Sequence, residues 1–136
     1  MMLTDAGPLF ALFDKGQKER HRQCVDAYRR ISSQLTTTWP CFTEAMYLLY
    51  EASGWSGQSK LWEFWNRNFL LVHNTDTAEQ QRMKVLMEKY RDTPMDLADA
   101  SLVAAAERLK QNRVFTLDSD FYVYRINDKD AFEIIS

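Results

Sequence analysis

Short stretches of β-forming residues alternate along the chain with longer stretches in which apolar residues recur at helical spacing. We expect five strands, at residues 1–4, 35–39, 69–73, 113–117 and 131–135. The helical segments that separate the first four are long enough for the crossovers that parallel strand pairing requires. The pattern therefore predicts an α/β fold, a three-layer α/β/α sandwich with a five-stranded parallel sheet.

The first connection is predicted to contain a turn and then a helix. Asp5, Gly7 and Pro8 are turn formers that directly follow the first strand. An amphipathic helix is expected after them, since its apolar residues recur at helical spacing. These apolar residues are Val25, Tyr28 and Ile31.

The later helices are predicted from their ends and their composition. Thr43 precedes an apolar run that stops at Gly54, so we expect a helix capped by threonine and ended by glycine. Residues 58–68 and 77–90 predict two further helices. Residues 96–110 are rich in alanine and leucine and end in cationic side chains, both of which favour a helix.

The composition is typical of one globular domain over residues 1–136, because 46% of the residues are hydrophobic and 13% aromatic. Cys24 and Cys41 show no CxxC spacing, which argues against a disulfide framework and a zinc site. No apolar run approaches the roughly 18 to 20 residues of a membrane span, and the N-terminus lacks signal-peptide features. We therefore expect a soluble cytoplasmic protein without a membrane partner.

The net charge of −2 argues against a broad electrostatic attraction for nucleic acid. Residues 15–30 differ from the whole chain, because they carry six basic side chains against two acidic ones. The basic residues are Lys15, Lys18, Arg20, Arg22, Arg29 and Arg30. Two interpretations stay open: the segment guides an RNA backbone, or it is the solvated face of a surface helix.

Acidic residues occur at four positions that are unusual for ordinary surface charges. Asp5 and Asp118 directly follow predicted strands, so both belong at the sheet edge where open α/β folds bind ligands. Glu44 lies at the start of a predicted helix, at the end of its apolar stripe. Asp99 shares the apolar helix face that should pack on the sheet, and a carboxylate buried there requires compensation.

Taken singly, three of these acids have ordinary explanations. Glu44 suits a helix N-terminus, Asp5 suits a turn, and Asp118 suits a solvated strand end. If all four converge, two carboxylates about 4 Å apart repel by about 4 kcal/mol at an effective dielectric near 20. Such a set requires a cation, and oxygen ligands without histidine or thiolate select Mg²⁺ or Mn²⁺.

The segments that contain these acids resemble the PIN-domain family, which includes the VapC-like ribonuclease toxins of prokaryotic toxin–antitoxin pairs. The segments are LTDAGPLFALFD, FTEAMYLL, PMDLADASLVAAAERL and FTLDSDF, and together they span nearly the whole chain. The resemblance implies a single PIN-like domain over residues 1–136. It also implies an Mg²⁺- or Mn²⁺-dependent endoribonuclease, in which bound metal assists hydrolysis of RNA phosphodiester bonds.

Residue roles follow from the same resemblance. The implied catalytic metal ligands are Asp5, Glu44, Asp99 and Asp118. Asp96 is either a further ligand or a helix N-terminal residue, and Asp120 either supports the ligands or is a spare ligand. The candidate substrate-binding residues are Thr116, Arg20, Arg22 and Arg125. Thr116 resembles a polar residue that the family places beside the metals. For Arg125 two interpretations stay open: a contact with phosphate, or an ion pair with a nearby acid.

We therefore expect the toxin of a type II toxin–antitoxin pair, with RNA as substrate, an antitoxin protein as partner and a homodimeric assembly. Trp55, Trp62, Phe64 and Trp65 form an aromatic cluster that belongs partly to the core, with an exposed share suited to a dimer contact or an antitoxin groove. The alternatives are a non-toxin RNA-processing nuclease and a non-catalytic PIN-like binding module. A third alternative is a receiver domain whose acids bind a regulatory cation. Such a domain would carry adjacent acids near the first strand, and the sequence has none there.

Overall fold

A computed structural model describes residues 1–136. Its main sheet consists of β1 (Met2–Thr4), β2 (Leu35–Thr38), β3 (Leu70–His73), β4 (Arg113–Phe115) and β7 (Glu133–Ile135). The strand order is β3-β2-β1-β4-β7, and every neighbouring pair is parallel. The predicted α/β fold with a five-stranded parallel sheet is confirmed.

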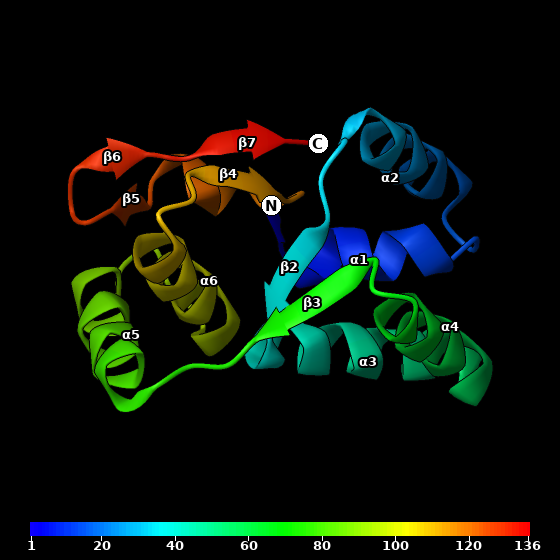
Figure 1. The fold of residues 1–136 in the computed structure, drawn as a ribbon, viewed down its shortest axis with the longest axis horizontal. Coiled ribbons are helices and arrows are strands. Elements are labelled where there is room, and N and C mark those ends of the chain that lie inside the picture. The colour runs from blue at the N-terminus through cyan, green and yellow to red at the C-terminus, as the bar shows by residue number, and fades with distance from the viewer.

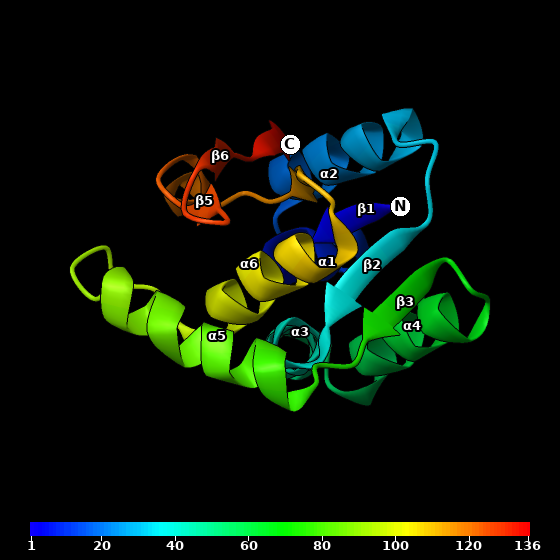
Figure 2. The same ribbon diagram turned by 60° about the vertical axis from the view of Figure 1, so that its left-hand side comes forward.

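Helices connect the strands (Figure 1). They are α1 (Ala6–Phe13), α2 (Lys18–Arg30), α3 (Trp39–Ser53), α4 (Trp55–Asn66), α5 (Thr77–Lys89) and α6 (Leu97–Leu109). Because parallel crossovers are right-handed, the path from β1 through β2 to β3 places α1 to α4 on one face of the sheet. The return from β3 to β4 places α5 and α6 on the other, and Figure 2 shows α6 in front of α1.

The core is one cluster of 32 buried hydrophobic residues. Helix α6 is its most deeply buried element, with every residue from Ala98 to Ala106 buried. A helix that is apolar on all sides is buried on all sides, and its small alanines allow the sheet and α5 to approach closely. No helix has the length and apolar character needed to cross a membrane.

Two helices differ from the sequence prediction, because α1 replaces a predicted turn and α3 begins earlier than expected. Asp5 is the N-cap of α1, so Gly7 and Pro8 lie in the first helical turn and do not form a separate turn. Helix α3 begins at Trp39, and its cap is Thr38, not the predicted Thr43. Proline is favoured in a first helical turn, where its missing N–H is not needed, and this explains both early starts.

The earlier start of α3 changes the position of Glu44 within its helix. Glu44 lies beyond the first turn and does not open the helix as predicted. The end of α3 agrees with the prediction, because Gly54 has a φ of 65°. This left-handed conformation is accessible to glycine at little cost.

The C-terminal region contains a small hairpin beside the main sheet. It consists of β5 (Arg125–Ile126) and β6 (Asp130–Ala131), which pair antiparallel. A 3₁₀ turn, η1 (Ser119–Tyr122), precedes it. The fifth strand of the main sheet is therefore shorter than predicted, because Ala131 pairs within the hairpin and only residues 133–135 join β4.

The hydroxyls of Thr38 and Thr43 differ in their hydrogen bonds, and so in their expected contributions to stability. The buried Thr38 hydroxyl accepts from the Cys41 N–H at 3.4 Å and contacts the Ser101 hydroxyl at 2.6 Å, whereas the exposed Thr43 hydroxyl bonds only to the Trp39 carbonyl. Thr38→Ala should lower the free energy of unfolding by about 1–2 kcal/mol, and Thr43→Ala by less than about 0.5 kcal/mol. Denaturant unfolding measures both values. Thr38→Ser keeps the hydroxyl and should recover most of the loss, whereas a larger effect at Thr43 would contradict this capping assignment.

Candidate metal centre

Three acidic side chains meet at the carboxyl edge of the sheet. Asp5 follows β1 and Asp118 lies just beyond β4, and these two strands are parallel neighbours. Asp99 reaches the same point from the first turn of α6. One carboxylate oxygen from each of the three lies within 4.8 Å of the others. The structure thus brings Asp5 together with two acids that lie more than 90 residues later in the sequence.

A pocket of about 240 Å³ surrounds this group. Its wall contains five acids, Asp5, Glu44, Asp96, Asp99 and Asp118, together with Arg20 and uncharged side chains. All four acids singled out from the sequence therefore border one cavity. Glu44 differs from the other three, because it is exposed on the wall and lies outside the compact group.

Neutral donors hold the Asp5 carboxylate. Its Oδ1 accepts from the Ala6 N–H at 2.8 Å, and its Oδ2 accepts from the Thr116 hydroxyl at 2.9 Å. The Cys41 thiol lies 3.8 Å from Oδ1. Burial raises the pKa of Asp5, although the Ala6 and Thr116 hydrogen bonds oppose that shift.

Thr116 links two of the acids. Its hydroxyl donates to Asp5 and accepts from the backbone N–H of Asp118 at 3.0 Å. The buried Thr116 side chain therefore supports the carboxylates and does not line the pocket. Thr116 therefore lies directly beside Asp5 and Asp118.

Asp99 is the most perturbed of the pocket acids. It is 6% exposed, and its Oδ2 accepts from the Tyr124 hydroxyl at 2.9 Å. Burial and the negative charges of Asp5 and Asp96 raise the pKa of Asp99 to about 8. Without a cation, this carboxyl is therefore largely protonated at neutral pH.

The remaining predicted ligands have defined structural roles. Asp96 is the N-cap of α6 and accepts from the Asp99 N–H at 2.8 Å, and it also borders the pocket. Asp118 is the N-cap of η1 and accepts from the Asp120 N–H at 2.9 Å. Asp120 itself is not among the residues that line the pocket. It contributes a backbone donor that orients Asp118.

The donor set fits a hard divalent cation. None of the ion pairs of the chain includes a pocket acid, and Arg20 borders the pocket without pairing to any of them. Burial raises the pKa of the Cys41 thiol well above its ordinary value, so no thiolate ligand is present. Carboxylate oxygens that lack a basic partner are the ligands that Mg²⁺ or Mn²⁺ prefers.

The other two candidate arginines lie away from the pocket lining. Arg22 pairs with Glu19 at 2.7 Å on the exposed surface of α2. Arg125 pairs with no acid, in contrast to one of the sequence-based alternatives. Its guanidinium donates to the carbonyls of Tyr122, Val123 and Tyr124 and so supports its own loop.

The aromatic cluster of Trp55, Trp62, Phe64 and Trp65 is largely exposed. Trp55, Trp62 and Trp65 are 65%, 37% and 40% exposed, so the tryptophans form the exposed share of the cluster. Only Phe64 is partly buried, and its ring packs edge-on against Phe13 at 5.3 Å. The three tryptophans lie on α4.

Sequence reasoning missed two residues that touch the acids. Cys41 contacts Asp5 from the first turn of α3, and Tyr124 contacts Asp99 from the residue before β5. Neither lies in a spacing that indicates chemistry, because each contact depends on how distant elements pack. The one available signal is the proximity of Tyr124 to Asp118 in the sequence.

Comparisons with known proteins agree with this fold. No model of a known protein family matches the sequence, and no curated protein matches it either. Among solved structures, VapC20 of Mycobacterium tuberculosis, a sarcin–ricin loop cleaving toxin, superposes with a TM-score of 0.84 at 13% identity, over 95% of this chain and 98% of that chain. A chain of a toxin–antitoxin complex from Klebsiella pneumoniae gives 0.68 at 20% identity, over 89% and 90%. The chain therefore has the fold of VapC-like PIN toxins.

The raised pKa of Asp99 predicts an unusual dependence of stability on pH. Metal-free folded protein keeps a proton on Asp99 between about pH 4 and pH 8, whereas the unfolded chain releases it near the ordinary aspartate pKa of 3.8. The unfolded state then binds fewer protons, so this group destabilises the fold as pH rises through that window. Asp99→Asn removes the effect, and its advantage over the native chain should grow by at least about 1.4 kcal/mol between pH 5 and pH 8.

Urea unfolding in EDTA at both pH values measures this difference. Asp92→Asn, at an exposed position outside the pocket, is the matched control and should show no such trend. An advantage of Asp99→Asn that is the same at both pH values would show that the Asp99 carboxyl titrates normally.

Proposed function

We propose that this protein is a metal-dependent endoribonuclease that hydrolyses RNA phosphodiester bonds, and that it is the toxin of a type II toxin–antitoxin pair. The observation that carries the proposal is the meeting of Asp5, Asp99 and Asp118 within 4.8 Å, without a basic partner. The VapC-like fold supports the same conclusion, since it places this group in a molecule shaped like known toxins.

Asp5, Asp99 and Asp118 are the residues that would hold Mg²⁺ or Mn²⁺, and Glu44 and Asp96 lie on the wall within reach of the same site. A bound divalent ion supplies Lewis acidity at the phosphate and makes water a better nucleophile at neutral pH. Asp120 is better described as a support for Asp118 than as a ligand.

The chain's own groups orient the acids and handle protons. Thr116 and the Ala6 N–H fix the direction of Asp5, and the Asp96 cap fixes the start of α6 beneath Asp99. Partial desolvation, followed by the charges of Asp5, Asp96 and Asp118, raises the pKa of Glu44. An acid tuned in this direction can accept the proton of an attacking water, and we assign that role to Glu44.

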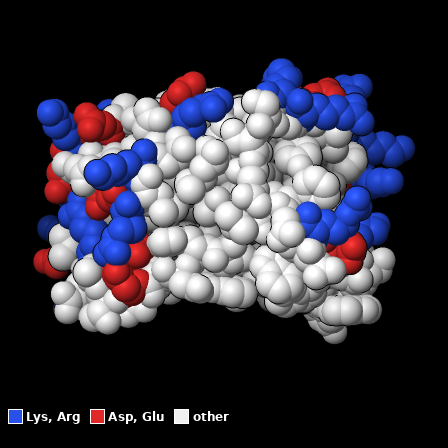
Figure 3. All heavy atoms as spheres, viewed as in Figure 1, with Lys and Arg blue, Asp and Glu red and all other residues white.

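Basic side chains near the pocket are suited to the RNA backbone. Figure 3 shows Lys and Arg gathered over α2 and α4, with a largely uncharged surface between them and the opposite end of the molecule. Arg20, on α2, is the basic residue that borders the acid pocket. We assign it a contact with a phosphate beside the scissile bond, since phosphate contacts position a nucleic acid without reading its sequence.

Two apolar surfaces are available for protein partners. One groove of about 410 Å³ is lined by Phe13, Tyr28, Phe64 and Phe69, with Lys60, Glu63 and Arg67 at its rim. We propose that an antitoxin segment binds there, because apolar pockets with charged rims suit an amphipathic helix.

The exposed aromatic side of α3, with Trp39, Tyr47 and Tyr50, is proposed as a homodimer contact in the cytoplasm.

RNA cleavage with and without Mn²⁺ tests the function directly. The native chain should cut RNA with Mn²⁺ and stop in excess EDTA. Asp99→Asn should lose at least about 100-fold in rate, since even groups that only support a metal ligand contribute 10- to 100-fold. Asp92→Asn should retain native activity. Equal cutting by native protein and Asp99→Asn would contradict the proposal, and RNA binding without cutting would favour the non-catalytic alternative.

A pair of arginine variants tests the substrate contact. Arg20→Gln should raise KM for RNA by about tenfold, because a charge-assisted hydrogen bond to phosphate contributes about 1.5 kcal/mol. Arg22→Gln, which alters a neighbouring arginine already paired with Glu19, should change KM by less than twofold. Steady-state kinetics at fixed salt measures both. Equal effects of the two variants would show that only the overall charge of α2 matters.

A further inference from the structure

Tyr124 is a buried tyrosine whose hydroxyl faces the acid pocket from behind. It follows η1 and directly precedes β5, and its side chain is fully buried. Its ring packs edge-on against Tyr90 and Phe121, each with centroids 5.1 Å away. Its hydroxyl donates to Asp99 Oδ2 at 2.9 Å. A fully buried hydroxyl requires such a partner, so the ring packing and the Asp99 contact fix each other.

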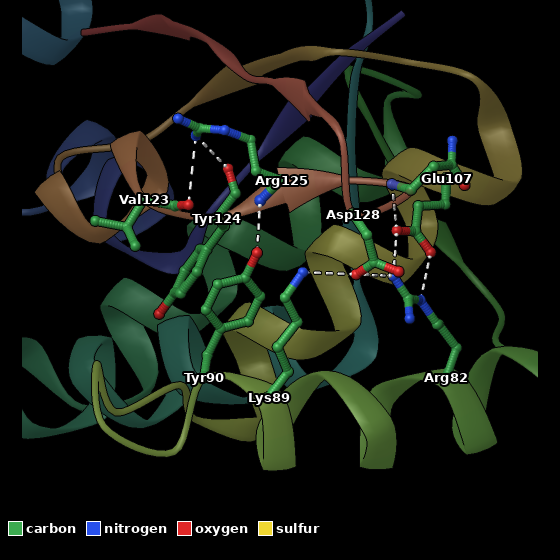
Figure 4. Close-up of polar contacts among 9 residues, drawn as sticks. Arg82, Lys89, Tyr90, Glu107, Val123, Tyr124, Arg125 and Asp128 are labelled. Carbon is green, nitrogen blue, oxygen red and sulfur yellow. Dashed lines mark hydrogen bonds and ion pairs between the residues drawn. The ribbon is translucent and has the colours of Figure 1, made fainter.

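The backbone around Tyr124 is held in place by contacts with α5 (Figure 4). The Tyr90 hydroxyl accepts from the Arg125 N–H at 3.0 Å. Further along the hairpin, Asp128 pairs with Lys89 at 2.8 Å and with Arg82 at 3.0 Å. In Figure 4 the Tyr124 side chain points away from these ion pairs. The position of its hydroxyl is therefore set by the packing of the hairpin on α5.

The hydrogen bond from Tyr124 engages only one of the two carboxylate oxygens of Asp99. Oδ2 is engaged by the Tyr124 hydroxyl, whereas Oδ1 takes part in no hydrogen bond of the structure. The carboxylate plane is thus fixed through one oxygen, and the other carries no competing donor in a carboxylate that meets Asp5 and Asp118. Asp5 differs, since its two supports come from the following helix and from Thr116 near β4.

We propose that Tyr124 is a positioning residue of the metal centre: its hydroxyl orients the Asp99 carboxylate so that its second oxygen binds the divalent ion. The inference rests on the proposed function, because it takes Asp99 as a metal ligand. Groups that hydrogen-bond to metal ligands commonly contribute 10- to 100-fold to metal affinity, and they do so by fixing ligand direction. Tyr124 never touches the substrate or the ion in this role.

The test is Mn²⁺ binding to Tyr124→Phe, measured by calorimetric titration without RNA. Phenylalanine keeps the ring contacts with Tyr90 and Phe121 and removes only the hydroxyl. We expect the Kd for Mn²⁺ to rise about 10- to 100-fold. Tyr122→Phe is the matched control, because it removes an exposed tyrosine hydroxyl two residues away that contacts no acid, and its Kd should stay within about twofold of native.

Thermal unfolding and RNA cleavage separate this role from a purely structural one. Thermal unfolding in EDTA checks that both variants are folded at the titration temperature. Native Mn²⁺ affinity in folded Tyr124→Phe would overturn the inference, as would equal weakening in Tyr124→Phe and Tyr122→Phe. If the native chain binds Mn²⁺ but cuts no RNA, the ribonuclease proposal fails, whereas a weaker Kd of Tyr124→Phe would still support the positioning role.

Discussion

Repulsion between carboxylates at the edge of a parallel sheet is the constraint on which the rest of this structure depends. Parallel strands point their carboxyl ends the same way, so the acids after β1 and β4 are neighbours by topology. Helix α6 adds a third acid from within the core. Burial lowers the effective dielectric and strengthens their repulsion, so the arrangement is favourable only when a cation or protons compensate it.

No basic residue forms an ion pair with the acids of the pocket. Elsewhere, acids are paired: Glu107 and Asp128 contact Arg82, and Asp76 contacts Arg108 at 2.6 Å. The pocket acids instead receive neutral donors, which fix their direction without cancelling their charge. This difference between the two sets of acids is what distinguishes a site built for an ion from an ordinary surface network. The same paired acids hold the hairpin that carries Tyr124.

The sequence predicts the fold and the location of the acids because both follow from short-range patterns. Strand and helix periods set the order of the layers, and strand ends set where Asp5 and Asp118 lie. The start of α3 was predicted incorrectly, since Thr43 looks like a cap unless the effect of Pro40 is weighed. Tyr124 and the exposed tryptophans depend on which helix faces meet, and periodicity alone does not determine that.

A crystal structure of the protein grown with Mn²⁺, with the ion located by its anomalous scattering, tests the central claim most directly. We expect an anomalous peak in contact with carboxylate oxygens of Asp5, Asp99 and Asp118, with Tyr124 still bonded to Asp99. A fully occupied Mn²⁺ elsewhere on the surface, with these three carboxylates turned away from one another, would contradict it.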